Sequence, residues 1–471
     1  MNKQFPTVEV PEFPDRIYQI TDYGAVPGGV VSNTKAFKDA IESANQAGGG
    51  VVNVPAGIWL TGPITLLSNV NLHTENGAFV LFSHDQQEYP LIKTSYEGGD
   101  RIRAVSPINA MEQENIAITG QGTFDGNGHL WRLVKRSKMT DEQWRILLRR
   151  GGVTKGEGER MVWFPSQTSY DGHMSKDIKP DEEHALERAQ KYFDYYRPVL
   201  VSLVKCKRVL LDGVTFQNSP AWNVHPLFCE HLTLSNAFIR NPWNAQNGDG
   251  LDLESCKYCN IINTKFDVGD DAICMKAGKN AEGRRTPVPT EYVTVKDCIV
   301  YHGHGGFVAG SEMSRGLRNI VVSNCIFAGT DIGIRFKSTL GRGGVVEDIL
   351  LEDIQMIDIP KQAMLFTMAY SGAMDDTQII PEDIPEFKNI TCKNIVCQGC
   401  GQAIQVDGLK QLPIHDLHFE DINIVARQGV RCQMADNIHL KNVTITNEND
   451  PKVKVHFDDE VVGEGFEAMI L

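Results

Sequence analysis

Tyr292-Val-Thr-Val295, Asn319-Ile-Val-Val322 and Asp348-Ile-Leu-Leu351 are three copies of one short pattern, in which a polar or aromatic residue precedes alternating apolar residues. The pattern recurs along the chain, usually at intervals of some 22 to 30 residues, and each copy is followed by a second short strand and by glycine-rich turns. A repeat of this length is typical of solenoid proteins. The other copies begin at Asn69, Asn115, Arg208, His231, Asn389 and Asn437.

The content of the repeat indicates which solenoid it forms. Between about Val199 and Asn447 the segments are short, β-branched and alternating, with Gly, Asn and Asp between them and no helical stretch of ten or more residues. This excludes leucine-rich, ankyrin and helical-pair arrays. We therefore predict an all-β fold, a parallel β-helix whose stacked coils share one core. Such stacking lets residues 1–471 form a single domain.

Two regions depart from the repeat. The stretch Thr34–Gly48 predicts an amphipathic helix closed by a glycine, within an N-terminal cap region at residues 18–60. Residues 128–197 are polar and helical in pattern, and we predict an insertion there that borders the binding cleft. The apolar residues of the capping helix recur at helical spacing: Phe37, Ala40, Ile41 and Ala44.

The insertion has an unusual local charge. Between His129 and Trp163 it carries nine Lys or Arg against four Asp or Glu, together with three tryptophans. One interpretation is a solvated surface excursion, which is common for charged runs. The other is a wall of a cleft, where indoles stack on sugar rings and cations meet carboxylates. The tryptophans are Trp131, Trp144 and Trp163.

Composition limits the possible partners. The 46 Lys and Arg against 60 Asp and Glu give a net charge of −14, which disfavours nucleic acids and anionic membranes as partners. No uncharged apolar run reaches the roughly 18 residues of a membrane span, and the start of the chain lacks the apolar region of an export signal. An acidic protein can still bind an anion through a local basic site.

The eleven cysteines are an odd number, so at least one is unpaired within the chain. Cys256-Lys-Tyr-Cys259 and Cys397-Gln-Gly-Cys400 each have the spacing of half a zinc site, but they are far apart in sequence. Cys298 and Cys325 occupy equivalent positions in successive repeats, where small buried side chains would stack. We therefore predict core cysteines rather than a zinc site.

Four polar motifs follow short apolar runs in the middle of the chain: Asn247-Gly-Asp249-Gly250, Gly269-Asp270-Asp271, Gly303-His304-Gly305 and Arg335-Phe-Lys337. They supply three carboxylates, one imidazole and two cations, which suits acid/base hydrolysis of an anionic sugar polymer. An inverting glycosidase separates its acid and base by roughly 6.5–9.5 Å. Three aspartates from two adjacent coils can give that gap, and crowding them raises the pKa of one.

The spacing within two motifs makes geometric predictions. Asp270 and Asp271 would face opposite sides of a strand, so the backbone must turn for both to reach the cleft, and Gly269 would allow that turn. The alternative is that Asp271 is buried and only caps a turn. Arg335 and Lys337 should share one face of a strand, where they either bind a uronate carboxylate or remain solvated.

Together with Ser219-Pro-Ala-Trp222-Asn-Val-His225-Pro, these motifs in this order resemble the polygalacturonase family, family 28 of the glycoside hydrolases. The resemblance covers most of the chain, from Ile20-Thr-Asp-Tyr-Gly-Ala25 to the last coils. It implies a right-handed parallel β-helix of the pectin-lyase-like type that hydrolyses α-1,4-linked galacturonan with inversion. It implies no metal and no cofactor.

The resemblance also implies roles for individual residues. Asp270 would be the general acid that protonates the leaving oxygen, while Asp249 and Asp271 would hold and activate water. His304 would be a hydrogen-bond partner that keeps the acid protonated or orients the sugar. Arg335 and Lys337 would bind the sugar beyond the cleaved bond. The residues expected to bind substrate are Asn247, Arg335, Lys337 and Tyr370.

Two features depart from the family pattern. Asn-Gly-Asp stands at 247–249, where the family usually has Asn-Thr-Asp, and this loosens the prediction of the standard substrate. The insertion at 128–197 could block one end of the cleft, which would favour release of single units from chain ends. Hydrolysis of rhamnogalacturonan or another substituted pectin is the alternative. A β-helical lyase and a non-catalytic carbohydrate-binding rod are alternatives from other classes.

The expected partner is therefore a pectic polysaccharide or oligosaccharide, with no nucleic acid or membrane partner. We expect an extracellular or periplasmic protein, with a cytoplasmic location left open because no export signal starts this sequence. The oligomeric state is not predicted.

Overall fold

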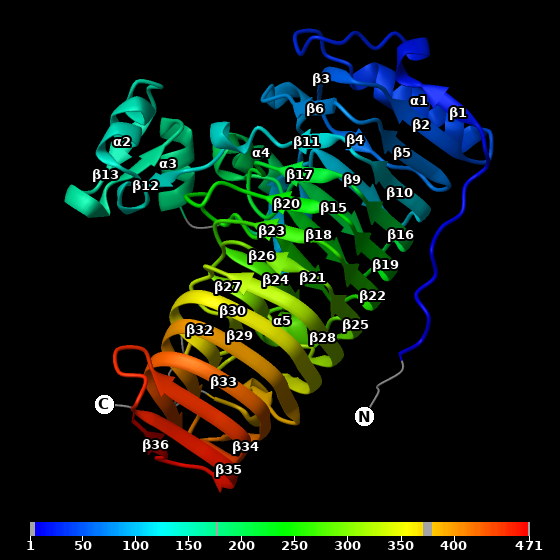
Figure 1. The fold of residues 1–471 in the computed structure, drawn as a ribbon. Coiled ribbons are helices and arrows are strands. Elements are labelled where there is room, and N and C mark those ends of the chain that lie inside the picture. Colours follow the sequence, from blue (N-terminus) through cyan, green and yellow to red (C-terminus); the bar gives the residue numbers. More distant parts are fainter. Residues whose placement is uncertain (1–4, 176–177, 371–378, 470–471) are drawn as a thin grey trace.

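The chain winds into a rod of stacked coils (Figure 1), as a computed structural model of residues 5–175, 178–370 and 379–469 shows. Most strands belong to one sheet system of 31 strands, and the pairs between coils are parallel. The predicted parallel β-helix is thereby confirmed. The capping helix lies at the N-terminal end of the rod, and the last strands close the opposite end.

The repeat signature has a backbone cause. The residues that open the nine copies of the pattern all have positive φ, between 50° and 65°. Asparagine and aspartate tolerate this left-handed region better than other non-glycine residues, and six of the nine are Asn or Asp. Their side chains also link neighbouring coils: Asn115 Nδ2 donates to Asn69 Oδ1 at 2.9 Å, and Arg208 Nε donates to Asn115 Oδ1 at 2.6 Å.

One row of parallel strands, here called the floor strands, carries the candidate site. Along each of them, alternate residues enter the core, and the residues between face outward. In register, Leu251 pairs with Ile273, and Phe307 pairs with Ile334. The floor strands pair in the order β15 (Val201–Val204), β18 (Val224–Leu227), β21 (Leu251–Glu254), β24 (Asp271–Lys276), β27 (Gly305–Gly310) and β29 (Ile334–Lys337).

Two further rows complete the coils. The second row consists of β10 (Glu114–Gly120), β16 (Lys207–Asp212), β19 (Glu230–Ser235), β22 (Lys257–Ile262), β25 (Thr290–Lys296) and β28 (Leu317–Ala328). The third consists of β11 (Thr123–Asp125), β17 (Thr215–Gln217), β20 (Phe238–Arg240), β23 (Lys265–Asp267) and β26 (Ile299–Val300). Nearer the C-terminus the rows merge into the long strands β30 (Val345–Thr367), β32 (Ile390–Asp407), β33 (Ile414–Gln433) and β34 (Ala435–Asn447).

Both ends of the rod are covered. Helix α1 (Thr34–Gln46) contacts β1 (Ile17–Gln19), β2 (Gly50–Val54) and the neighbouring strands, and it buries the four apolar residues predicted to form its inner face. The capping helix is therefore confirmed. At the other end, β35 (Lys454–Val462) pairs antiparallel with β34, which shields the last core coil.

The core runs continuously along the rod, and all eleven cysteines are buried and free. Cys298 and Cys325 stack in adjacent coils, with their thiols donating to backbone carbonyls. This confirms the prediction of core cysteines.

The predicted insertion forms a small unit that projects from the rod (Figure 1). Trp131, Trp144 and Trp163 are buried, with 1%, 6% and 4% of their surfaces exposed. The interpretation of these indoles as sugar-stacking platforms is therefore wrong, because they form the apolar interior of the insertion and its junction with the rod. Its elements are β12 (Val134–Lys135), the 3-10 turn η4 (Arg136–Lys138), α2 (Asp141–Leu148), β13 (Val153–Lys155), β14 (Val162–Phe164), α3 (Gln167–Met174) and α4 (Ala185–Gln190).

A second excursion, not predicted from the sequence, is the antiparallel hairpin of β7 (Leu91–Tyr96) and β8 (Gly99–Ala104). No helix in the described part of the chain is both long and apolar enough to cross a membrane.

Candidate active site

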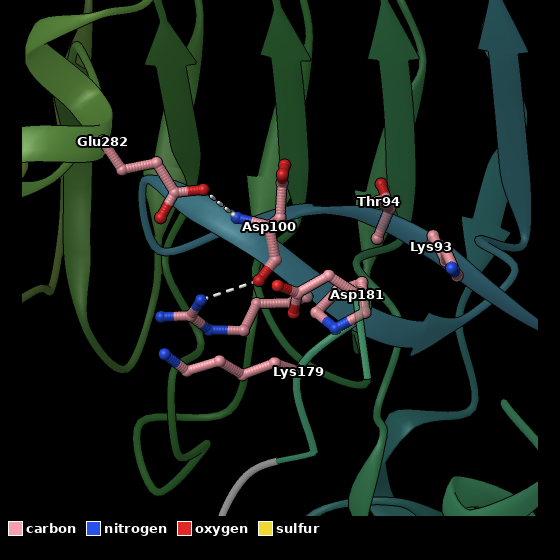
Figure 2. A pocket seen from close by; sticks show the side chains of 8 residues that line it. Lys93, Thr94, Asp100, Lys179, Asp181 and Glu282 are labelled. Carbon is pink, nitrogen blue, oxygen red and sulfur yellow. Dashed lines mark hydrogen bonds between the residues drawn. The ribbon is translucent and has the colours of Figure 1, made fainter. Parts of the chain in front are cut away.

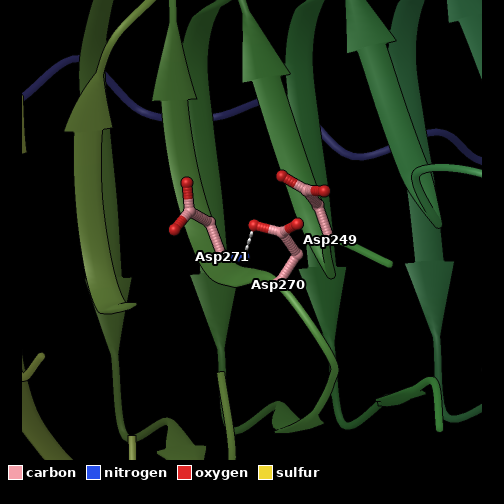
Figure 3. Close-up of side chains that lie close together, drawn as sticks. All are labelled: Asp249, Asp270 and Asp271. Carbon is pink, nitrogen blue, oxygen red and sulfur yellow. Dashed lines mark hydrogen bonds between the residues drawn. The ribbon is translucent and has the colours of Figure 1, made fainter. Parts of the chain in front are cut away.

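The three predicted aspartates meet at the N-terminal edge of two adjacent floor strands. Asp249 lies just before β21, Asp270 just before β24, and Asp271 is the first residue of β24. One carboxylate oxygen of each lies within 4.8 Å of the others. Figure 3 shows the three side chains close together on neighbouring strands. These nearest oxygens are closer than the roughly 6.5–9.5 Å expected between acid and base, because two of the residues are consecutive and the third lies on the neighbouring coil.

Asp271 is a buried, ion-paired carboxylate. Its Oδ2 accepts from Lys337 Nζ at 2.5 Å, and its Oδ1 accepts from an Arg335 guanidinium nitrogen at 3.2 Å. Burial alone would raise the pKa of Asp271, but Lys337, Arg335 and Lys276 outweigh that effect and lower the pKa to about 2. Asp271 is thus ionised at neutral pH. The alternative that it only caps a turn does not account for these two ion pairs.

Asp249 is buried in a different electrostatic setting. Its Oδ1 has no hydrogen-bond partner among the described residues. Burial, followed by the charges of Asp270 and Asp252, raises the pKa of Asp249 well above its ordinary value. In the trio of Asp249, Asp270 and Asp271, the pKa of one carboxyl is thus raised and that of another lowered. The raised one is Asp249, which was predicted to hold water, and not Asp270, the predicted acid.

Asp270 is the most exposed of the three, with 20% of its side chain accessible. Its Oδ1 accepts from the Asp271 backbone N–H at 3.0 Å and lies 3.1 Å from His304 Nδ1. The His304 backbone N–H also donates to the Asp270 carbonyl at 2.8 Å. The imidazole thus contacts the carboxylate, as the sequence predicted.

Gly269 is required for space. A Cβ at this position would lie 2.6 Å from the Pro242 carbonyl oxygen and 2.9 Å from that of Trp243, and no positive φ distinguishes the residue. The glycine is therefore needed because two loops pack closely at this point, and not because the backbone adopts a conformation reserved for glycine. The loop that precedes Asp249 packs directly against the loop that carries Asp270.

Arg335 and Lys337 share the outer face of β29, while Phe336 is buried in the core. The predicted alternation is confirmed, and neither cation is a freely solvated charge, since both contact Asp271. The Tyr370 ring lies 5.6 Å from the Arg335 guanidinium carbon and 5.1 Å from Lys337 Nζ. Tyr370, predicted only loosely, thus joins the cationic side of the site.

Asn247 lies at the edge of the trio in a left-handed conformation, with φ of 55°. Its Oδ1 accepts from Arg197 Nη2 at 2.9 Å, and Arg197 also donates to the Gln246 carbonyl. The sequence did not single out Arg197, the last residue of the predicted insertion. The insertion therefore holds the loop that leads into Asp249.

On the other side of the trio lies a buried charged cluster that was not predicted from the sequence. Lys276 Nζ lies 2.9 Å from Glu312 and 3.4 Å from Asp252, and it packs 4.6 Å from the Trp222 ring. Burial disfavours its charge, but neighbouring acidic groups raise the pKa of Lys276. The alternation in Leu251-Asp-Leu-Glu254 could have indicated outward carboxylates here.

The β7–β8 hairpin covers this second side. Tyr96 packs against Trp222 in a tilted arrangement with ring centroids 4.4 Å apart, and Arg103 lies 3.7 Å over the Tyr96 ring. Below the hairpin, a small cavity of 70 Å³ separates it from outward residues of β15 and β18. We call this hairpin the roof.

The tip of the roof is tied to a later coil. Lys279 N–H donates to the Gly98 carbonyl, and Asp100 N–H donates to Glu282 Oε1, each at 3.0 Å. Figure 2 shows the hairpin crossing in front of the strands of the rod to reach Glu282. An open pocket of 560 Å³ beside it is lined by both cations and carboxylates, including Lys93, Asp100 and Lys179.

Three carboxylates this close could also hold a cation. Asp271, however, already has two cationic side chains against its oxygens. The donor set is therefore better matched to proton transfer than to a divalent ion.

Comparison with known proteins identifies the family. Residues 186–448, more than half of the chain, match the model of glycosyl hydrolases family 28. The chain belongs to this family. It is a glycoside hydrolase, and the predicted enzyme class is confirmed.

Relatives and solved structures agree with this assignment. A probable polygalacturonase from Vitis vinifera is 28% identical over 415 residues, covering 86% of this chain and 73% of the relative. An exo-poly-alpha-D-galacturonosidase from Dickeya chrysanthemi is 28% identical over 83% of this chain and 64% of its own length. The exopolygalacturonase structure from Thermotoga maritima gives a TM-score of 0.78 at 29% identity, covering 99% of this chain and 97% of that one. The predicted right-handed fold is confirmed by this likeness.

Proposed function

We propose that this enzyme hydrolyses α-1,4-galacturonosidic bonds in polygalacturonate and removes units from chain ends. The observation that carries the proposal is the arrangement around the trio, with cations on one side and a roof on the other. Enzymes of the same family with similar folds are named exopolygalacturonases, which supports the substrate and the mode of action.

In the proposed mechanism, Asp270 protonates the leaving oxygen, since it is the carboxyl most exposed to the cleft and it contacts His304. A water held by Asp249 and Asp271 attacks the anomeric carbon from the opposite face, and Asp271, which is ionised, receives its proton. Because water attacks directly and no covalent intermediate forms, the configuration at that carbon is then inverted. His304 orients the Asp270 carboxyl for proton transfer.

Arg335, Lys337 and Tyr370 line the β29 side of the trio, where the sugar beyond the cleaved bond would lie. Their charge suits the carboxylate of a uronate. Asn247 shapes the entry to Asp249 through Arg197.

End-on action is supported by the roof. Tyr96 and Trp222 fill the space over the floor strands that a polymer would occupy if it extended past the trio in that direction. A chain end can enter from the open, cationic side, whereas an internal bond would need the sugar chain to pass through the roof.

The test is product analysis on polygalacturonate, rhamnogalacturonan and methyl-esterified pectin, with Asp270→Asn protein as the control. We expect new reducing ends from polygalacturonate, with monogalacturonate as the early product. Mixed oligomers would reject exo action, and preferential release from rhamnogalacturonan would reject the substrate. Products absorbing in the ultraviolet would indicate a lyase. An extracellular or periplasmic location remains our prediction for a polymer-degrading enzyme.

A further inference from the structure

The insertion places one lysine at the trio. Lys138 ends the turn η4, and its Nζ lies 3.4 Å from the Gly269 carbonyl oxygen and 3.5 Å from His304 Nε2. His304 precedes β27, the floor strand between those of Asp271 and Arg335. Lys138 therefore lies on the leaving-group side of Asp270, opposite the roof.

Within the described part of the chain, Lys138 differs from the other cations around the trio in having no carboxylate partner. Arg335 and Lys337 are paired with Asp271, Lys276 with Glu312, and Lys361 with Asp331. Among the described residues, no carboxylate oxygen lies within 4 Å of Lys138 Nζ, and its two polar neighbours are a carbonyl and an imidazole. An ammonium in this position has capacity for an incoming anion.

The insertion holds this lysine in place. Arg136 N–H donates to the Met161 carbonyl at 2.8 Å, Arg136 Nη1 donates to the Met139 carbonyl at 2.6 Å, and Arg136 also pairs with Asp141. The turn is thus fixed to the sheet and to helix α2 of the insertion. Partial burial lowers the pKa of Lys138, an effect that Asp270 partly offsets, and a partly desolvated ammonium binds a carboxylate more strongly than a solvated one.

We propose that Lys138 is a specificity-determining residue that binds the carboxylate of the uronate on the leaving-group side of the cleaved bond. This inference rests on the proposed function. It gives the insertion a direct role in substrate recognition, through one cation rather than through its buried indoles. Arg335 and Lys337 line the same side of the trio but already share their charge with Asp271. Lys138 can therefore pair with a substrate carboxylate without displacing an ion pair of the described residues.

The test measures binding separately from turnover. In Asp270→Asn protein, the affinity for trigalacturonate and for its methyl ester is measured by calorimetry, with and without Lys138→Met. We expect Lys138→Met to weaken trigalacturonate binding about 10- to 100-fold, as for loss of a hydrogen bond to a charged group, and to leave ester binding within about twofold. Lys138→Arg should keep most of the affinity. Lys135→Met removes an exposed charge of the same insertion and should change neither ligand's affinity.

Equal weakening for the acid and the ester would overturn the inference in favour of a positioning role through His304, and unchanged trigalacturonate binding would overturn it outright. The two proposals fail separately. If the wild-type enzyme cleaves no galacturonan while Lys138 still discriminates acid from ester, the proposed function fails and the carboxylate site stands. If galacturonan is cleaved without that discrimination, only the site fails.

Discussion

The floor and the cover of the site are built in different ways. The floor places Asp249, Asp270 and Asp271 by the register of parallel strands, so residues distant in sequence become neighbours through the repeat itself. The cover consists of the roof hairpin and the insertion, which interrupt the repeat. They reach the site by single contacts such as Tyr96 to Trp222 and Lys138 to His304. The comparison indicates that the repeat sets the chemistry, while the interruptions set which part of a polymer can reach it.

The largest expected effect is the loss of turnover on substitution of Asp270, which the floor strands position. Asp270→Asn removes the proposed proton donor while keeping the size of the side chain, so turnover should fall by about 10³-fold or more. Steady-state rates on polygalacturonate check this expectation. Unfolding by urea should show unchanged stability, and wild-type-like rates from purified variant would reject Asp270 as the acid.

Lys337→Met should lower the free energy of unfolding more than any other substitution proposed for the floor strands. It leaves the buried Asp271 with Arg335 alone, and breaking a buried pair costs about 3 kcal/mol. Urea unfolding at neutral pH measures the loss. The matched control is Lys361→Met, which breaks the exposed pair with Asp331 and should cost below about 1 kcal/mol. Equal losses in both variants would contradict the account of Asp271.

The pH dependence of stability follows from the same pair. The pKa of Asp271 is about 2 in the folded protein, below the ordinary 3.8, so its ionised form contributes stability above about pH 4. That contribution is lost as pH falls from about 4 toward 2. In Lys337→Met the contribution should shrink, so the gap in stability between variant and wild type should narrow in this window. If the difference in stability instead widens on acidification, the lowered pKa assigned to Asp271 is contradicted.

Substitutions in the roof should change the pattern of early products more than they change the rate of hydrolysis. Tyr96→Ala removes the ring that packs on Trp222, at a cost of about 3 kcal/mol in stability, and opens space beside the trio. We expect early oligomer products to appear besides monogalacturonate. Chromatography of early digests checks this, with Lys93→Ala on the same hairpin as the control. A pattern of monomer alone from a folded Tyr96→Ala enzyme would show that the roof does not set the mode of action.

The smallest expected effect concerns the tip of the roof. Glu282→Gln weakens the bond from the Asp100 N–H but keeps an acceptor, so stability should change by less than about 1 kcal/mol. Thermal unfolding checks the value. A loss as large as that of Tyr96→Ala would mean that the tip, rather than the aromatic pair, holds the roof.

The floor was predictable because its signals are local and periodic. Asn319 and its equivalents mark left-handed corners, and alternation places Arg335 and Lys337 on one face. The roof hairpin and the insertion interrupt the repeat, and the residues that make their contacts do not recur at regular intervals in the sequence. Nothing in the sequence around Tyr96 or Lys138 indicates which strand they meet, and the buried state of Trp144 depends on a small apolar interior that the charged run conceals. The limits proposed for the cap region, 18–60, and for the insertion, 128–197, remain predictions.

The most direct test of the account is proton NMR of the first products formed from polygalacturonate. An enzyme with this acid, this water-holding pair and this roof should release monogalacturonate first, and because the substrate linkage is α, inversion should give the β-anomer before mutarotation. Early α-anomer, or a mixture of oligomers without excess monomer, would contradict the account.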